Sequence, residues 1–362
     1  MQRIPVYEPS LGGNVSAYVN DCLESGWISS RGAYIERFEQ AFAAFTGAKD
    51  AVTVANGTVA IHLALEALGI GPGDEVIVPS FTYVASVNTI LQAGATPVYV
   101  DSLESTLQVD PDSVRGAITS RTRAVMAVHL YGHPCDMDAL VEICNANGLK
   151  LIEDCAEAFG TYWKGQHVGT FGDAATFSFF GNKTITTGEG GMVLARDPAV
   201  VARCRHLKSQ GVSPTREYWH DVLAYNYRMT NIQAAIGLAQ IERADELLRA
   251  KARLAQAYRE KLAGLPLRTH DAVGDVTHSY WMCSILLDRP DDRQPLRAHL
   301  NEAGIDTRPF FPQCHLMPHC HADIVLPVGA DISSRGVNLP SFPTLSDEQI
   351  DYICSHIASF WK

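Results

Sequence analysis

Residues 179–192 read Phe179-Phe-Gly-Asn-Lys183-Thr-Ile-Thr-Thr-Gly-Glu-Gly-Gly-Met192, with one lysine among small, hydroxylated and glycine residues. Short apolar runs of β-prone residues flank this stretch at 174–178 and 192–194. Most lysines are solvated charges on flexible stems, but nothing near this lysine forms an ordinary charged helix face. Glycines at 188, 190 and 191 allow backbone or a ligand to come close. A lysine in a partly dry site can attack a carbonyl to form a Schiff base, so Lys183 is the first candidate catalytic residue.

On the N-terminal side of this stretch, short apolar strands alternate with helices. The pattern predicts strands at 51–54, 75–79, 96–100, 124–129 and 150–153, and helices at 14–23, 34–45, 59–68, 86–93, 110–117 and 136–147. Such alternation is typical of parallel βαβ units, so we expect an α/β fold with a mostly parallel sheet between helices. Ligands of such sheets bind outside the carboxyl ends of the strands. The residues that follow each strand are therefore where we look for a site.

The C-terminal part has a different order of elements. After a predicted helix at 198–209, residues 232–262 show helical spacing with almost no Gly or Pro, which predicts one unusually long helix. A strand at 279–287, helices at 294–304 and 346–360, and a Pro/His-rich loop at 308–321 then indicate a smaller α+β domain. We expect a large domain at 1–245, which carries the lysine, and a small C-terminal domain at 246–362. Residues 1–13 are predicted to be a loosely ordered entry segment.

Composition argues against several classes of protein. The 362 residues are 46% hydrophobic and 19% charged, which is enough apolar material for a large core. No apolar run of about 18 residues predicts a membrane span, and the first residues lack the apolar segment of a secretory signal. We therefore expect a cytoplasmic protein without a membrane partner. The net charge is −11 with no basic tail, which argues against nucleic acid as a partner.

The nine cysteines are scattered, odd in number and contain no CxxC pair. They indicate buried or free thiols in a reducing compartment. Cys314-His315 and His319-Cys320 together suggest a metal at first sight, but their spacing does not match an ordinary zinc site. We expect no metal.

Several residues after predicted strands supply what a Schiff-base lysine needs. Asn56-Gly57-Thr58 stands where a strand enters a helix; it is either a plain helix cap or a cup for phosphate. Asp154 follows an apolar strand and could cap the next element or hydrogen-bond a ring nitrogen. Tyr83 could pack ordinarily or stack on an aromatic cofactor. Together these parts predict a site for pyridoxal phosphate (PLP), in which the freed Lys183 moves a proton as general base and acid.

Longer motifs strengthen this interpretation. They are Asn56-Gly57-Thr58, the run 79–83 (Pro-Ser-Phe-Thr-Tyr), 129–132 (His-Leu-Tyr-Gly), 152–158 (Ile-Glu-Asp-Cys-Ala-Glu-Ala), 178–191 around Lys183, and 225–230 (Tyr-Asn-Tyr-Arg-Met-Thr). With these motifs, spread over nearly the whole chain, the sequence resembles the DegT/DnrJ/EryC1/StrS sugar aminotransferases. The resemblance implies the fold-type-I aminotransferase architecture, with the large domain binding PLP.

The resemblance also implies roles for individual residues. Lys183 would hold PLP as a Schiff base and act as the catalytic base, Asp154 would pair with the pyridine nitrogen, and Glu157 would lie near the phenolic oxygen. The phosphate would be held by three residues, Gly57, Thr58 and Ser178. Tyr83 would stack on the ring. Asn226 would reach the phosphate of the neighbouring subunit's cofactor, so the active unit would be a homodimer with shared active sites, alone or paired into a tetramer.

His315 would contact the sugar or nucleotide of the substrate. The preceding Pro312-Gln313-Cys314 departs from the expected family pattern, in a loop where the choice of sugar would be set.

The reaction implied is transamination of a nucleotide-linked 4-keto-6-deoxy sugar with L-glutamate as amino donor. Alternatives within the class are other keto sugars, such as the precursor of an 8-amino octulosonate. A related sugar dehydratase has histidine in place of the lysine, so Lys183 argues against it. A PLP-binding regulator of the same fold usually adds a DNA-binding segment, for which this chain has neither spare length nor basic charge.

Overall fold

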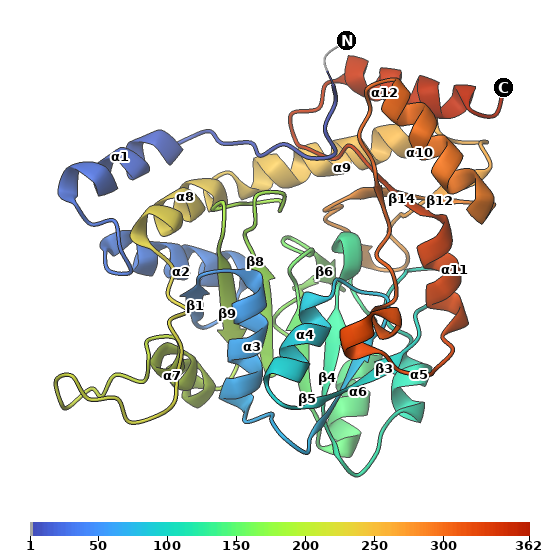
Figure 1. Cartoon of the computed structure of the whole chain (residues 1–362). Coiled ribbons are helices and arrows are strands. Elements are labelled where there is room, and N and C mark those ends of the chain that lie inside the picture. Colours follow the sequence, from blue (N-terminus) through green and yellow to red (C-terminus); the bar gives the residue numbers. More distant parts are fainter. Residues whose placement is uncertain (1–2) are drawn as a thin grey trace.

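The computed structural model describes residues 3–362, and its centre is a seven-stranded sheet with strand order β1-β9-β8-β5-β4-β2-β3 (Figure 1). The strands are β1 (Ala51–Val54), β2 (Glu75–Pro79), β3 (Thr96–Val100), β4 (Thr122–Val128), β5 (Lys150–Asp154), β8 (Ala174–Ser178) and β9 (Gly191–Ala195). Neighbouring strands pair in parallel except at β9, which is antiparallel to both β1 and β8. The mostly parallel sheet predicted from the strand–helix alternation is therefore confirmed.

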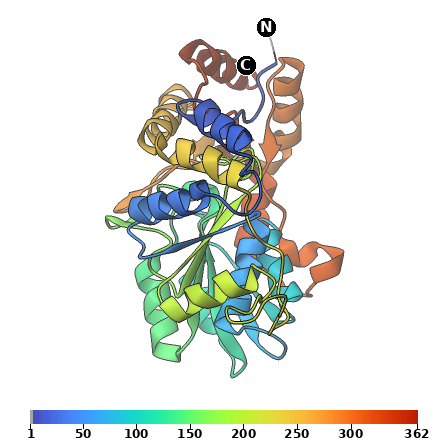
Figure 2. The same cartoon turned by 90° about the vertical axis from the view of Figure 1, so that its left-hand side faces the viewer.

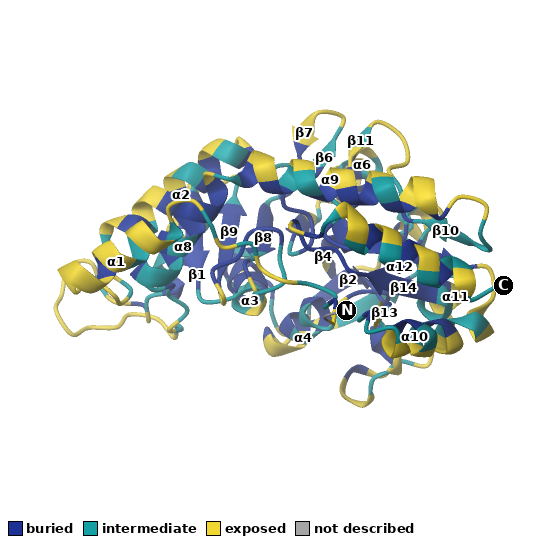
Figure 3. Ribbon diagram, turned by 90° about the horizontal axis from the view of Figure 1, so that it is seen from above, coloured by how far each residue is buried: buried dark blue, intermediate teal, exposed yellow. Residues whose placement is uncertain are grey.

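Helices cover both faces of this sheet (Figures 1 and 2). One face is covered by α3 (Gly57–Leu68), α4 (Ala85–Gln92) and α7 (Pro198–Leu207), and the other by α2 (Ala33–Thr46), α5 (Pro111–Gly116), α6 (Met137–Asn147) and α8 (Asn231–Ile241), with α1 (Val15–Ser25) against α8. Successive strand residues point to opposite faces: Ile152 packs with α3 and α4, whereas Leu151 packs with α6. Seen from above, the inner strands of the sheet are consequently mostly buried (Figure 3), whereas only the last residue of the edge strand β3, Val100, is buried.

A second sheet has strand order β10-β12-β14-β13 and is antiparallel throughout. It contains β10 (Leu267–Thr269), β12 (Cys283–Leu287), β13 (Arg308–Pro309) and β14 (Gly336–Leu339), and its core is closed by α9 (Ala244–Lys261), α10 (Arg293–Glu302) and α12 (Asp347–Ser359). Helix α11 (Pro327–Arg335) packs toward the large sheet. A third small sheet joins β6 (Tyr162–Trp163) and β7 (Gln166–His167) to β11 (Val276–Thr277). The predicted smaller α+β part is present, and the domain boundary at 245/246 stays a prediction.

The long helix predicted for residues 232–262 is wrong, because the structure breaks it at Glu242 and Arg243 into α8 and α9. Both residues at the break bind the N-terminal segment. The Glu242 carboxylate accepts hydrogen bonds from Asn14 and Tyr18, each at 2.8 Å, and the Arg243 guanidinium donates to the Ser10 carbonyl at 3.1 Å. The Glu242 N–H still donates to the Leu238 carbonyl at 3.1 Å, whereas the Arg243 N–H donates to the Gln240 carbonyl at 3.0 Å. Arg243 has φ −108° and ψ 10°, so the regular helix is interrupted at this residue.

The expectation of a loosely ordered entry segment is also wrong for residues 3–13. Ile4 is 1% exposed and packs into the core of the C-terminal sheet, where its N–H donates to Gly304 at 2.9 Å. The Tyr7 hydroxyl donates to the carbonyl of Lys183 at 2.8 Å. The segment therefore connects the small sheet to the candidate catalytic loop.

Two expectations from composition can be compared with the structure. All nine cysteines are free thiols with buried side chains, as predicted. Between residues 3 and 362, none of the helices has both the length and the apolar character that crossing a membrane requires.

Candidate active site

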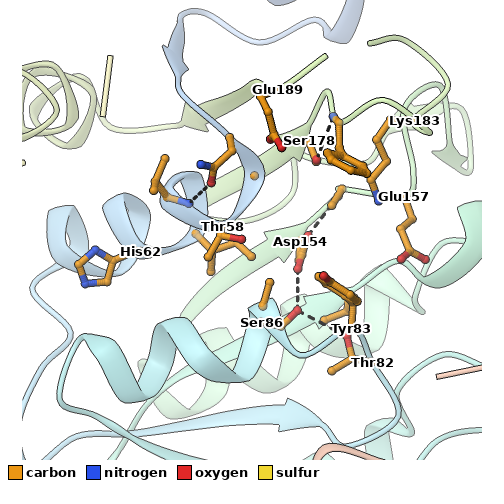
Figure 4. A pocket seen from close by; sticks show the side chains of 18 of the residues that line it. Thr58, His62, Thr82, Tyr83, Ser86, Asp154, Glu157, Ser178, Lys183 and Glu189 are labelled. Carbon is orange, nitrogen blue, oxygen red and sulfur yellow. Dashed lines mark hydrogen bonds between the residues drawn. The ribbon is translucent and has the colours of Figure 1, made fainter. Parts of the chain in front are cut away.

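A pocket of about 810 Å³ opens at the carboxyl ends of β5 and β8, beside the N-terminus of α3. Seven of the residues predicted from the sequence line it. They are Gly57, Thr58, Tyr83, Asp154, Glu157, Ser178 and Lys183. The side chains of Lys183, Asp154 and Glu157 lie around one space, although they come from segments far apart in the sequence (Figure 4). The structure thus brings together most of the predicted site.

Lys183 lies in the loop that follows β8, and its N–H donates to the Phe180 carbonyl at 2.9 Å. Its Nζ is 3.9 Å from the centre of the Trp281 ring. Burial lowers the pKa of the Lys183 amine, and the nearby carboxylates of Glu157 and Asp154 oppose that change. A lowered pKa increases the fraction of neutral amine, which is the form that attacks a carbonyl.

Asp154 is the last residue of β5 and is 4% exposed. One carboxylate oxygen accepts a hydrogen bond from the Ser86 hydroxyl at 2.7 Å, and the other accepts from the Ala156 N–H at 3.1 Å. Each oxygen keeps a further lone pair available. An oriented carboxylate of this kind, facing the pocket, can hold a proton on a heterocyclic nitrogen.

Glu157 is 6% exposed and accepts a hydrogen bond from the Tyr131 N–H at 2.8 Å. Tyr131 has a positive φ of 56°, an uncommon conformation for a bulky residue, and this turn aims its N–H at the carboxylate. Burial raises the pKa of Glu157 to about 7, while Lys183 acts in the opposite direction. Glu157 can therefore hold or release a proton near neutral pH.

The N-terminus of α3 forms a cradle for an anion. The Asn56 side chain caps the Val59 N–H at 3.0 Å, whereas the N–H groups of Gly57 and Thr58 have no acceptor within residues 3–362. A side chain at position 57 would place its Cβ 2.7 Å from the Cβ of Ser178, so only glycine fits there. Free N–H groups at a helix start, beside a serine hydroxyl, suit a phosphate group.

One of the three glycines near Lys183, Gly191, allows a close approach of the backbone. A Cβ at this position would lie 2.5 Å from the Asn56 carbonyl oxygen. Gly191 therefore lets β9 approach the backbone that enters α3, and it keeps the cradle next to the lysine loop.

Asn226 and His315 do not line the pocket of this chain. Asn226 is exposed in the segment before α8, although its neighbours Tyr225 and Tyr227 do reach the pocket wall. His315 is 2% exposed, and its Nδ1 lies 2.7 Å from the Ser80 hydroxyl. The roles inferred for both residues stay predictions.

Sequence reasoning missed two residues that shape the pocket. Ser86 orients Asp154 from the first turn of α4, and Trp281 places its ring against the lysine amine. Ser86 is three residues after Tyr83, a spacing that could have indicated the contact. No motif around Trp281 predicted that it would reach the pocket, because this residue comes from the C-terminal part of the chain.

The described residues contain one cluster of potential metal ligands, His129, Glu153 and Cys155. The Glu153 carboxylate already accepts three backbone N–H groups at 2.7–2.9 Å, and His129 Nδ1 accepts from the Cys135 N–H at 3.0 Å. These hydrogen bonds give the cluster a structural role. We assign no ion to it.

A lysine, an oriented carboxylate and an anion cradle at the carboxyl ends of a mostly parallel sheet define a PLP-dependent enzyme of the fold-type-I aminotransferase class. Residues 9–358 match the DegT/DnrJ/EryC1/StrS aminotransferase family. The chain belongs to this family, whose members are PLP-dependent sugar aminotransferases.

Individual relatives agree with this assignment. The chain is 54% identical over 363 residues to GDP-perosamine synthase of Escherichia coli O157:H7, and the match covers 100% of both chains. It is 53% identical over 364 residues to GDP-perosamine synthase of Vibrio cholerae, with 99% of both covered. The PLP form of a sugar aminotransferase of Streptococcus pneumoniae superposes with a TM-score of 0.94 at 29% identity, covering 99% of this chain and 98% of the other. The predicted family, fold and cofactor are confirmed.

The raised pKa of Glu157 predicts how stability changes with pH. Between the ordinary value of 4.5 and about 7, the folded protein keeps a proton that the unfolded chain has lost, so burial of Glu157 costs stability as pH rises through this window. Glu157→Gln removes that cost. Going from about pH 5 to about pH 8, we expect the cofactor-free variant to gain roughly 1–3 kcal/mol in free energy of unfolding relative to the unchanged protein.

Urea unfolding at both pH values measures this difference. The exposed Glu260→Gln is the control and should show no such gain. A difference that does not depend on pH would contradict the assignment.

Proposed function

We propose that the chain converts GDP-4-keto-6-deoxy-D-mannose to GDP-perosamine with L-glutamate as amino donor, in the cytoplasm, for the biosynthesis of a surface polysaccharide. The carrying observation is the convergence of Lys183, Asp154 and the α3 cradle on one pocket of about 810 Å³. The choice of sugar rests on the two relatives named GDP-perosamine synthase, which are 53–54% identical to the chain over essentially its full length.

Each pocket residue has a task in this proposal. When bound, PLP supplies an aldehyde that condenses with amines and a ring that accepts the electrons left by deprotonation. Lys183 anchors the cofactor, and its freed Nζ takes the proton from the substrate carbon and returns it. Asp154, oriented by Ser86, keeps the ring nitrogen protonated. Glu157, which lines the same pocket, would lie near the phenolic oxygen and would hold or release a proton there.

The remaining residues position the cofactor. The N–H groups of Gly57 and Thr58 and the hydroxyl of Ser178 hold the phosphate. Tyr83, 5.5 Å from Phe311 between ring centres and 56% exposed, has room to stack on the ring. For His315, which lies against Ser80 and does not line the pocket of this chain, we keep the contact with the sugar or nucleotide that the family resemblance implies.

The charge of the pocket supports a homodimer with shared active sites. Asp154, Glu157 and Glu189 line the pocket, and Lys183 is the only Lys or Arg among its lining residues in the described part of the chain. The substrate diphosphate and the donor carboxylates are all anionic, so further polar or cationic groups from a second copy would complete the pocket. Asn226 is exposed in the segment before α8, so it is free to reach the site of a second copy.

The loop before Asn226 presents apolar side chains that fit the same partner. Tyr218 is 98% exposed, Leu223 is 91% exposed, and Trp219 lies between them in the sequence at 46%. Large apolar side chains gathered on one loop are typical of a protein interface. A second copy of the chain would cover them while it places Asn226 at the neighbouring site.

Lys183→Ala tests the anchor. We expect complete loss of covalent PLP, because no other lysine lines the pocket in the described residues. Borohydride reduction followed by peptide mass spectrometry locates the attachment, with the exposed Lys164→Ala as a control that keeps it. Covalent cofactor in the Lys183 variant would remove the residue from its role.

A substrate panel tests the sugar. The purified protein, loaded with PLP and supplied with L-glutamate, should form GDP-perosamine from GDP-4-keto-6-deoxy-D-mannose at least about tenfold faster, by kcat/KM, than it aminates other nucleotide-linked keto sugars. Chromatography with mass detection follows each product. Preference for another keto sugar, or for an octulosonate, would replace the substrate while leaving the aminotransferase class in place.

Mixed dimers test the shared site. Lys183→Ala and Asn226→Ala chains should each have little activity alone, whereas refolding them together gives hybrid dimers with one intact site. Random mixing should restore about a quarter of the unmodified activity. Absence of recovery, with hybrids verified by native mass spectrometry, would show that Asn226 serves the site of its own chain or none.

A further inference from the structure

The backbone at the lysine is held from two distant parts of the chain. The Trp281 indole Nε1 donates to the Asn182 carbonyl at 2.8 Å, and the Tyr7 hydroxyl donates to the Lys183 carbonyl at 2.8 Å. The Trp281 ring also lies against the lysine amine, with Nζ 3.9 Å from the ring centre. Two consecutive carbonyls and the amine itself are therefore fixed by these two aromatic residues.

Lys251, in α9, connects the two aromatic residues. Its side chain is fully buried, and Nζ donates to the Trp281 carbonyl at 2.8 Å and to the Ser341 carbonyl. The Ser341 N–H donates to Val6 at 2.9 Å, directly before Tyr7, and Lys251 Nζ lies 5.2 Å from the centre of the Tyr7 ring. Together these contacts form a closed ring of interactions. It links Lys251, Trp281, Asn182, Lys183, Tyr7 and Ser341.

A lysine is an unusual residue at this fully buried position. Within residues 3–362 it forms no ion pair, its hydrogen-bond acceptors are backbone carbonyls, and burial lowers its pKa to about 8. An unpaired buried charge is costly, and an apolar side chain of similar volume often serves stability as well or better. Packing alone therefore does not account for a lysine here.

We propose that Lys251 is a positioning residue that fixes Trp281 against Lys183 and thereby orients the catalytic amine and favours its protonated form. This inference rests on the role of Lys183 proposed above. The face of an indole ring attracts a cation, most strongly where water is excluded. Trp281 thus opposes the lowering of the Lys183 pKa by burial. The closed ring of interactions keeps the Trp281 indole in place beside the amine.

The orientation matters for the proton transfer. The freed Lys183 has to collect a proton at one carbon and deliver it at another, and small displacements of a catalytic group cost up to roughly a hundredfold in rate. Lys251 does not touch the reacting atoms and acts through Trp281. Its removal should lower kcat while the cofactor stays bound.

Three variants separate this role from a general loss of stability. Trp281→Leu removes the aromatic face, and Lys251→Met keeps the volume but removes the hydrogen bonds to Trp281 and Ser341. Tyr258→Phe is the matched control: Tyr258 also lies in α9, is 1% exposed, and donates to the Pro340 carbonyl at 2.9 Å without touching Trp281.

The measurement is the pH dependence of acetic anhydride labelling of the Lys183 amine in cofactor-free protein, read by peptide mass spectrometry. We expect labelling to begin at lower pH in Trp281→Leu and in Lys251→Met, and to be unchanged in Tyr258→Phe. In the PLP-loaded protein, kcat of Lys251→Met should fall by roughly ten- to hundredfold with cofactor content preserved.

Two results would overturn the proposal. One is an unchanged labelling profile in Trp281→Leu and Lys251→Met, and the other is an equal shift in Tyr258→Phe. If Lys251→Met does not fold, the pair Trp281→Phe and Trp281→Leu decides, because only the first keeps an aromatic face beside the amine. The labelling uses no cofactor, so its failure is distinguishable from a failure of Lys183 to bind PLP.

Discussion

The parallel pairing of β5 with β8 is the constraint on which the site depends. Asp154 is in register with Thr176, two residues before the end of β8, so the carboxylate and the start of the lysine loop reach the same edge of the sheet. The N-terminus of α3 opens at that edge as well, and Gly57 lets it contact Ser178. Because parallel strands end together, the lysine, the carboxylate and the anion cradle that we propose for a flat, phosphorylated ring lie within one pocket.

The same pocket brings buried ionisable groups close together. Burial lowers the pKa of Lys183 and raises that of Glu157, and each group opposes the change in the other. Asp154 avoids the isolation of a buried charge through the bonds from Ser86 and Ala156. Perturbed groups of this kind, facing a cleft, are what acid–base chemistry near neutral pH requires. The pocket of one chain is nevertheless short of cations for its anionic substrates.

The C-terminal part and the N-terminal segment act as a support for the lysine loop. Residues 3–13 cross from the small sheet, where Ile4 is buried, to Lys183, which Tyr7 contacts. The break between α8 and α9 belongs to the same arrangement, since Arg243 at the break donates to the Ser10 carbonyl of this segment. Contacts from both the N-terminal segment and the C-terminal part therefore reach the lysine loop.

Local patterns in the sequence determined the strand–helix alternation, the sheet class, and the residues at or just after the strand ends, among them Asp154 and Lys183. These features follow from hydrophobic periodicity and from motifs within a few residues, which a sequence displays directly. Only the tertiary structure decided that Trp281, Tyr7 and Lys251 meet at the lysine, and that a helical pattern continuous in sequence is broken at Glu242. Those outcomes depend on contacts between residues 30 to 228 positions apart, whose energies do not appear in local periodicity.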